Sequence, residues 1–191
     1  MKSLPVSGIP FLLGAVFLTV AMSPSLAQSQ GVGTAVRDAY FRTVAEHFDV
    51  PKGEVAIVGD WELEADEVPV VFFLSRKAGV APDALIGLRR SGLPWVAVAN
   101  RFGLGVGSFH LPLPEDVPLG SLSRAYGEFR GRPSREWNLI ELDDSEVVAL
   151  VNLRVLSEQM EIPPLRVLQG REEAGSFVAG FGRLRERAPV H

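Results

Sequence analysis

The chain has 191 residues, a formal net charge of −4 and no cysteine. A sequence without cysteine excludes disulfides, thiolate metal sites and a cysteine nucleophile, so packing alone must stabilise the domain. The mildly acidic balance does not favour binding to a polyanion, and we expect no nucleic-acid partner.

The first 27 residues have the three-part layout of a secretory signal peptide. Lys2 is followed by an uncharged apolar run over residues 9–22 and then by small residues at Ser25 and Ala27. The apolar run is shorter than the roughly 20 residues that a membrane-spanning helix needs. We therefore predict cleavage after Ala27, a periplasmic or secreted bacterial protein, and no stable membrane span after cleavage.

Hydrophobic periodicity predicts three long helices in the mature chain. The first runs over residues 34–49, after a flexible lead-in at 28–33, and carries apolar residues at i, i+4 spacing. The second runs over residues 66–77, with a proline in its first turn. The third follows Asp143 and is apolar on most of its circumference, so we expect it at the centre of the fold.

Three short segments share one pattern, at residues 50–58, 80–88 and 162–168. Each follows a predicted long helix and begins with a β-branched residue and a proline, which is typical of a short helix with Pro in its first turn. The last two segments continue through a glycine turn to an aromatic residue, Trp95 or Phe177, that opens a further helix. Repeated units of this kind must pack on one another to bury their apolar faces.

The repeat predicts an all-α fold in a single compact domain over residues 34–187, with a tail at 188–191. The domain would consist of two related helical-hairpin halves, at about 34–104 and 119–187, joined by a long Gly/Pro-rich loop that covers residues 103–137. We expect nine apolar residues in its core: Val71, Phe72, Leu85, Trp95, Phe102, Val148, Val151, Leu156 and Phe177.

Two stretches carry a resemblance to other proteins. They are residues 66–71 leading to Trp95 and to the Phe102-Gly103-Leu104 region, and residues 144–156 leading to the Pro163-Pro164 turn. On these stretches the chain resembles a group of uncharacterised exported bacterial proteins. The resemblance supports the two-part helical interpretation and implies no activity.

One segment near the middle of the chain concentrates arginine and aromatic residues. Its candidate binding residues are Arg124, Tyr126, Phe129, Arg130, Arg132, Arg135 and Trp137. Arginine and aromatic side chains are enriched at binding hot spots. Two interpretations stay open: either the aromatic side chains anchor the segment on the core while the arginines project into water, or the segment binds an envelope protein or an anionic envelope component.

The sequence contains few motifs that are typical of a catalytic, metal-binding or nucleic-acid-binding site. Residues 82–104 resemble a DNA-reading helix-turn-helix, but export and an apolar second helix argue against that use. No histidine spacing indicates a metal site, and nothing indicates a cofactor. The acidic stretch Asp60, Glu62, Glu64, Asp66 and Glu67 is interpreted as a solvated approach to a helix.

The favoured function is accordingly a non-enzymatic binding or interaction module in the envelope, without catalytic residues. The alternative is a small secreted hydrolase with a site near His110, using Ser108 or one of the acidic clusters.

Overall fold

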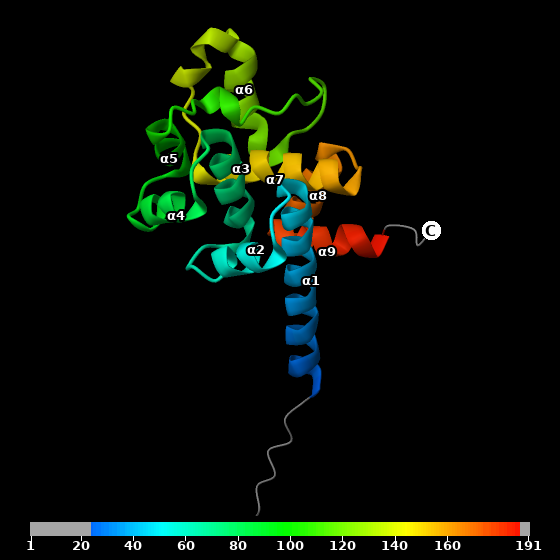
Figure 1. Ribbon diagram of the computed structural model, residues 1–191. Coiled ribbons are helices and arrows are strands. Elements are labelled where there is room, and N and C mark those ends of the chain that lie inside the picture. The colour runs from blue at the N-terminus through cyan, green and yellow to red at the C-terminus, as the bar shows by residue number, and fades with distance from the viewer. Residues whose placement is uncertain (1–23, 188–191) are drawn as a thin grey trace, which may run out of the picture.

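The computed structural model describes residues 24–187, with side chains from residue 33 onward, and this part of the chain is an all-α domain without strands (Figure 1). The predicted fold class is thereby confirmed. The tail at 188–191 and nearly all of the predicted signal peptide at 1–27 lie outside the described residues. Between residues 24 and 187, no helix combines the length and apolar character needed to cross a membrane.

The helices follow one another through short connections. The α-helices are α1 Pro24–Phe48, α2 Lys52–Gly59, α3 Val68–Ala78, α4 Pro82–Arg90, α5 Trp95–Arg101, α6 Ser123–Gly131, α7 Asp144–Met160, α8 Pro164–Ala174 and α9 Phe177–Arg187. Four 3-10 helices lie between them: η1 Ala65–Glu67, η2 Val106–Ser108, η3 Gly120–Leu122 and η4 Ser134–Leu139.

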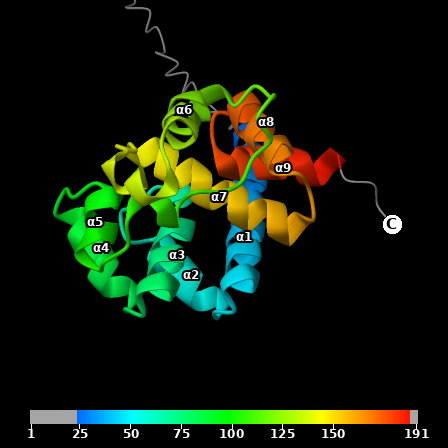
Figure 2. The same cartoon turned by 90° about the horizontal axis from the view of Figure 1, so that it is seen from above.

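Helix α7 lies at the centre of the domain, as its sequence predicts. Seen from above, it runs through the middle, with α2 and α3 on one side and α6 and α8 on the other (Figure 2). Its start is fixed by a capping box, in which the Asp143 carboxylate accepts from the Glu146 amide at 2.8 Å and the Glu146 carboxylate accepts from the Asp143 amide at 3.0 Å. Most of its apolar side chains are fully buried, which makes α7 the core element on which both ends of the chain pack.

Local sequence signals place most helix boundaries correctly. Helix α3 ends at Gly79, which adopts the left-handed conformation that glycine accepts at low cost. The three proline-initiated segments form α2, α4 and α8, and Trp95 and Phe177 open α5 and α9 as expected. Seven of the nine predicted core residues are buried, whereas Phe102 and Val148 are only partly buried.

Two boundaries differ from the prediction. Residues 28–33 were expected as a flexible lead-in but belong to α1, which continues through Gly31 and Gly33 although glycine disfavours a helix. A helix stabilised by packing further along can extend in this way, because each added residue needs no new nucleation. The segment after residue 104 was expected as one long loop, but 123–131 forms α6 and 134–139 forms η4. Tertiary burial of the apolar face of α6 outweighs the low helix propensity of its two glycines.

Candidate functional site

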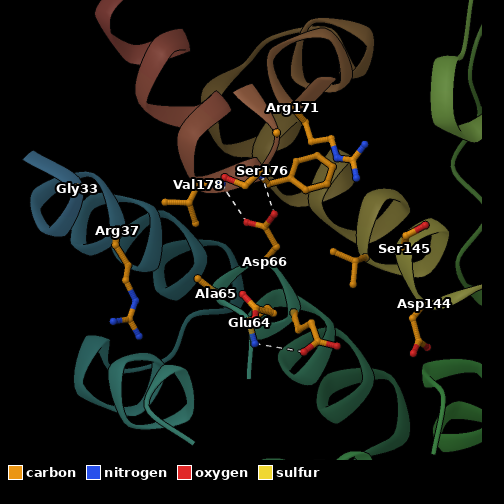
Figure 3. Close-up of a pocket in the computed structure, with 14 residues that line it drawn as sticks. Gly33, Arg37, Glu64, Ala65, Asp66, Asp144, Ser145, Arg171, Ser176 and Val178 are labelled. Carbon is orange, nitrogen blue, oxygen red and sulfur yellow. Dashed lines mark hydrogen bonds between the residues drawn. The ribbon is translucent and has the colours of Figure 1, made fainter. Parts of the chain in front are cut away.

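A pocket of about 530 Å3 opens where three parts of the chain meet. Its walls come from η1, from the first turns of α7 and from the turn between α8 and α9, with Gly33 and Arg37 of α1 at one side (Figure 3). The lining mixes the aliphatic side chains of Val148 and Val178 with carboxylate, hydroxyl and guanidinium groups. Val148 is only partly buried because it faces this pocket.

Asp66 lies at the centre of the pocket and holds the start of α9 (Figure 3). Its carboxylate accepts hydrogen bonds from the backbone amides of Phe177 at 2.7 Å and of Val178 at 3.0 Å. Burial raises the pKa of the Asp66 carboxyl above its usual value, and the two amides and the nearby Arg171 oppose this shift only in part. The result is a carboxylate with a perturbed pKa in a cleft, which is a common feature of functional sites.

Arg171 of α8 lines the same pocket and lies against the ring of Phe177, with 6.0 Å from the guanidinium carbon to the ring centroid. Within the described residues, its guanidinium makes no hydrogen bond or ion pair with a protein group; Asp66 acts on it only through space. A partly buried guanidinium has five N–H donors, so Arg171 has unused donors at the pocket wall.

A second arginine, Arg89 of α4, is placed in a similar way and is fully paired. It lies over the ring of Trp95 at 5.1 Å and bonds two carboxylates, Glu67 at 2.6 Å and Asp144 at 2.6 Å. Glu67 also accepts from the indole N–H of Trp95 at 2.9 Å, and Asp144 accepts from the backbone amide of Trp95 at 2.7 Å. Burial disfavours the charge of Arg89, but the hydrogen bonds to Asp144 and Glu67 hold its pKa above the usual value.

The two arginine clusters share two features of spacing and capping. Each arginine precedes its aromatic partner by six residues, and each aromatic residue opens the last helix after a glycine turn. An aspartate from the start of the other long helix region binds the first amide of that last helix: Asp144 binds Trp95, and Asp66 binds Phe177. We call the group of Arg89, Glu67, Asp144 and Trp95 the closed cluster.

We call the group of Arg171, Asp66 and Phe177 the open cluster, because it lacks the counterparts of two groups of the closed cluster. The residue after Asp66 is Glu67, whereas the residue after Asp144 is Ser145, whose hydroxyl donates to Asp143 at 2.7 Å instead. The ring of Phe177 has no N–H group, whereas the indole ring of Trp95 has one. The second carboxylate and its indole donor are therefore both missing beside Arg171, at the pocket wall.

The aromatic residues of the segment from Arg124 to Trp137 lie in the core or at its edge. Tyr126 and Phe129 are 2% and 3% exposed, and the Tyr126 hydroxyl donates to the carbonyl of Leu111. Trp137 is partly buried and donates from its indole N–H to the carbonyl of Phe129 at 3.1 Å. Burial raises the pKa of Tyr126 to about 12. These rings anchor the segment rather than project from it.

The arginines of that segment contact groups of the protein itself. Arg124 bonds the buried Glu146, Arg132 bonds Glu128 at 2.9 Å, Arg130 donates to the carbonyl of Pro114 at 2.8 Å, and Arg135 lies 3.3 Å from Glu136. The structure thus brings Tyr126, Phe129 and Trp137 together and points the four arginines to different partners. The burial of the aromatic rings matches the first interpretation of the segment, whereas the arginines contact protein groups and do not only project into water.

His110 lies among aromatic rings and not among catalytic groups. Its ring centroid is 4.4 Å from that of Trp137 and 4.9 Å from that of Phe129. Burial, followed by the charge of Arg154, lowers the pKa of His110. In the described residues its imidazole has no hydrogen-bonded serine or carboxylate, and Ser108 does not line the small pocket beside it.

In the acidic stretch at 60–67, Asp60, Glu62 and Glu64 are exposed as predicted, whereas the last two residues differ from the predicted role as a solvated approach. Asp66 and Glu67 are partly buried, because the tight turn of η1 directs them to α9 and to Arg89. Sequence reasoning missed this role and missed Arg171. A signal for both roles was present in the sequence, because the spacing from Arg89 to Trp95 equals the spacing from Arg171 to Phe177.

Comparison with known proteins gave no match, either to a family model, to a curated protein or to a solved structure. Across residues 24–187, no group of three His, Asp or Glu side chains is arranged to hold a metal ion. The candidate site therefore depends on its own geometry.

Proposed function

We propose that the protein is a non-enzymatic binding module of the bacterial envelope that takes its ligand in the pocket around Asp66. The observation that supports this most strongly is the unpaired guanidinium of Arg171 at the wall of a 530 Å3 pocket. The Arg171 nitrogens are not among the fully buried side-chain atoms without a partner in the described residues, so water or a ligand can accept from them. A pocket with apolar walls and a few converging polar groups is the usual form of a ligand site.

The proposal includes a relation between the two halves of the domain. In this view α3, α4 and α5 correspond to α7, α8 and α9, and each half supplies the aspartate that caps the last helix of the other. The matching arginine-to-aromatic spacing and the matching caps on Trp95 and Phe177 support this relation. One half then keeps a closed cluster that stabilises the fold, while the other keeps an open cluster at the pocket.

The segment from Arg124 to Trp137 is less suited to binding than its sequence suggests. Its aromatic side chains are buried or partly buried, and its arginines already have partners. We therefore place the proposed binding function at the pocket and assign this segment an anchoring role. No observation favours the hydrolase near His110, because in the described residues the imidazole has no hydrogen-bonded serine or carboxylate. Glu115 lines the small pocket beside the ring but makes no hydrogen bond or ion pair with it.

A pocket-filling variant tests the proposal. Val148→Trp places a large side chain in the pocket, and Ile57→Trp makes the same kind of change on the exposed surface of α2, where Ile57 is 55% exposed. A small-molecule fragment library is screened by ligand-observed NMR against the wild type and both variants. We expect a set of fragments that bind the wild type and Ile57→Trp but lose their signal with Val148→Trp. If Val148→Trp changes no fragment signal, the pocket is not the binding site.

A further inference from the structure

The closed cluster shows which chemical group satisfies an arginine in this fold. Arg89 is stacked on Trp95 and takes two carboxylates, one from Asp144 and one from Glu67. Glu67 bonds both the Nε and an Nη of Arg89, at 3.0 and 2.6 Å, through a single carboxylate oxygen. The planar guanidinium fork is well matched to a carboxylate in this geometry.

The open cluster has the arginine and the first carboxylate but not the second one. The Arg171 guanidinium carbon lies 6.0 Å from the centroid of the Phe177 ring. Asp66 caps Phe177 as Asp144 caps Trp95, but unlike Asp144 it makes no hydrogen bond to the arginine of its cluster. The place of Glu67 is taken by Ser145, whose short side chain is turned to Asp143. The space beside Arg171 is the pocket itself, so a carboxylate from outside could reach the donors that Glu67 would otherwise occupy.

The charge of the pocket is compatible with such a group. The closed cluster combines one arginine with two carboxylates, and it forms a tight network with that balance. A ligand carboxylate would give Arg171 and Asp66 the same balance of one cation and two anions. Glu67 and Asp144 are both already bound to Arg89. Glu64 is exposed to water, and its charge adds to the raised pKa of Asp66.

We propose that Arg171 binds the carboxylate of a ligand, in the way that Arg89 binds Glu67, with the apolar part of the ligand against Val148 and Val178. This inference rests on the proposed function and names the ligand class of the same pocket. A carboxylate can come from a glutamate side chain of a peptide or from a free C-terminus. Both sources present the same planar group with two oxygens.

Three short peptides serve as probes. The first is a capped tripeptide with a central glutamate, the second is the same peptide with glutamine, and the third is an alanine tripeptide with a free C-terminal carboxylate. Binding is measured by titration with NMR detection of the Phe177 and Val178 amides, which lie at the pocket. Inorganic phosphate is titrated as a fourth probe, because a guanidinium also accepts phosphate.

Three variants locate the contact. Arg171→Met removes the guanidinium, and Arg171→Lys keeps the charge without the fork. Arg37→Met is the control, because Arg37 also lines the pocket but one of its Nη atoms already donates to the Gly59 carbonyl at 2.8 Å and pairs with Asp60. Its buried Nε lacks a partner in the described residues, so the variant also tests whether that donor contributes to binding. Circular dichroism checks that each variant keeps its helical content.

The expected result is binding of at least one carboxylate peptide and none of the glutamine peptide. Arg171→Met and Arg171→Lys should weaken that binding about tenfold or more, and Arg37→Met about twofold or less. Binding of the glutamate peptide alone would identify a side-chain carboxylate as the source. Binding of the alanine peptide alone would identify a free C-terminus. Equal binding of the glutamine peptide, equal losses in Arg37→Met, binding of phosphate alone, or no binding of any carboxylate peptide would overturn the inference. Fragments that bind the pocket without depending on Arg171 would leave the binding module intact and refute only the carboxylate.

Discussion

In both arginine clusters an aspartate caps the helix that the aromatic residue opens, but only one of the two arginines is bonded to carboxylates. In the closed cluster every donor of the Arg89 fork that faces the protein has a partner, and Trp95 is completely buried beneath it. In the open cluster the change from Glu67 to Ser145 and from Trp95 to Phe177 leaves Arg171 without a bonded carboxylate beside a pocket. The comparison indicates that differences at two side chains accompany the contrast between a bonded arginine and one with free donors at a pocket wall.

The largest expected effect concerns the aromatic residue of each cluster. Trp95→Ala should lower the free energy of unfolding by about 4 kcal/mol, and Phe177→Ala by about 3 kcal/mol, because each leaves a cavity in the core. The loss of stability should be larger for Trp95→Ala, because this variant also removes the indole N–H that donates to Glu67. Urea unfolding measures both. Equal costs would mean that the hydrogen bond adds nothing to the closed cluster.

Removing each arginine should separate the two clusters more clearly. Arg89→Met leaves the partly buried Glu67 and Asp144 without their cation, and we expect a loss of about 2–3 kcal/mol in the free energy of unfolding. Arg171→Met breaks no ion pair, so its cost should stay below about 1 kcal/mol. The comparison is made by urea unfolding at low ionic strength. A loss in Arg171→Met as large as that in Arg89→Met would contradict the assignment of an open cluster.

A third comparison uses one glycine in α9 and one in α4. A Cβ added at Gly180 of α9 would lie 2.7 Å from the backbone carbon of Gly170, so Gly180→Ala must push α8 and α9 apart. We expect a loss of about 1–3 kcal/mol. At Gly87 of α4 no atom lies within 4 Å, and Gly87→Ala should raise stability by up to about 1 kcal/mol. Thermal unfolding followed by circular dichroism distinguishes a fall from a rise in Tm.

The smallest expected effect is a pH dependence of the open cluster. Because burial raises the pKa of Asp66, the folded protein binds a proton at this carboxyl more tightly than the unfolded chain does. The contribution of Asp66 to stability therefore falls as the pH rises from 3.8, the usual pKa of the group, through the raised pKa in the folded protein. Asp66→Asn should remove this fall, so the variant gains on the wild type as pH rises.

Asp143→Asn serves as a control of opposite sign. Although burial favours the neutral form, the Ser145 hydroxyl and the Glu146 amide hold the pKa of Asp143 below its usual value. The contribution of Asp143 to the stability of the fold is therefore present above pH 3.8 and is lost as the pH falls through the lowered pKa of this group. Urea unfolding between about pH 3 and 7 compares the two variants with the wild type, and parallel curves would contradict the assignment for Asp66.

Local signals were sufficient to predict most of the helices. The capping box at Asp143, the prolines that open α4 and α8 and the glycine after α3 act within one or two turns, so they can be read from neighbouring residues. Helix α6 was missed because burial of Tyr126 and Phe129 outweighs its glycines, and burial depends on the whole fold.

The candidate site was harder to predict than the helices. Asp66 meets Phe177 across 111 residues of sequence, and Arg89 meets Asp144 across 55. No local pattern specifies such pairs, and composition alone directed attention to the arginine-rich segment around α6. Composition records which side chains are present but not whether they are already paired, and that distinction separates Arg171 from Arg124 and Arg132.

The cap that Asp66 places on α9 also bears on how the chain folds. Closing a loop of 111 residues costs more conformational entropy than forming the contacts within α3 or between α8 and α9. Contacts so distant in sequence raise the contact order, which slows folding in small proteins. We expect the α8–α9 hairpin to form early through its own local contacts and to dock late, when η1 is in place. The walls of the pocket would then be assembled in the last step of folding, and they would separate first when the domain opens.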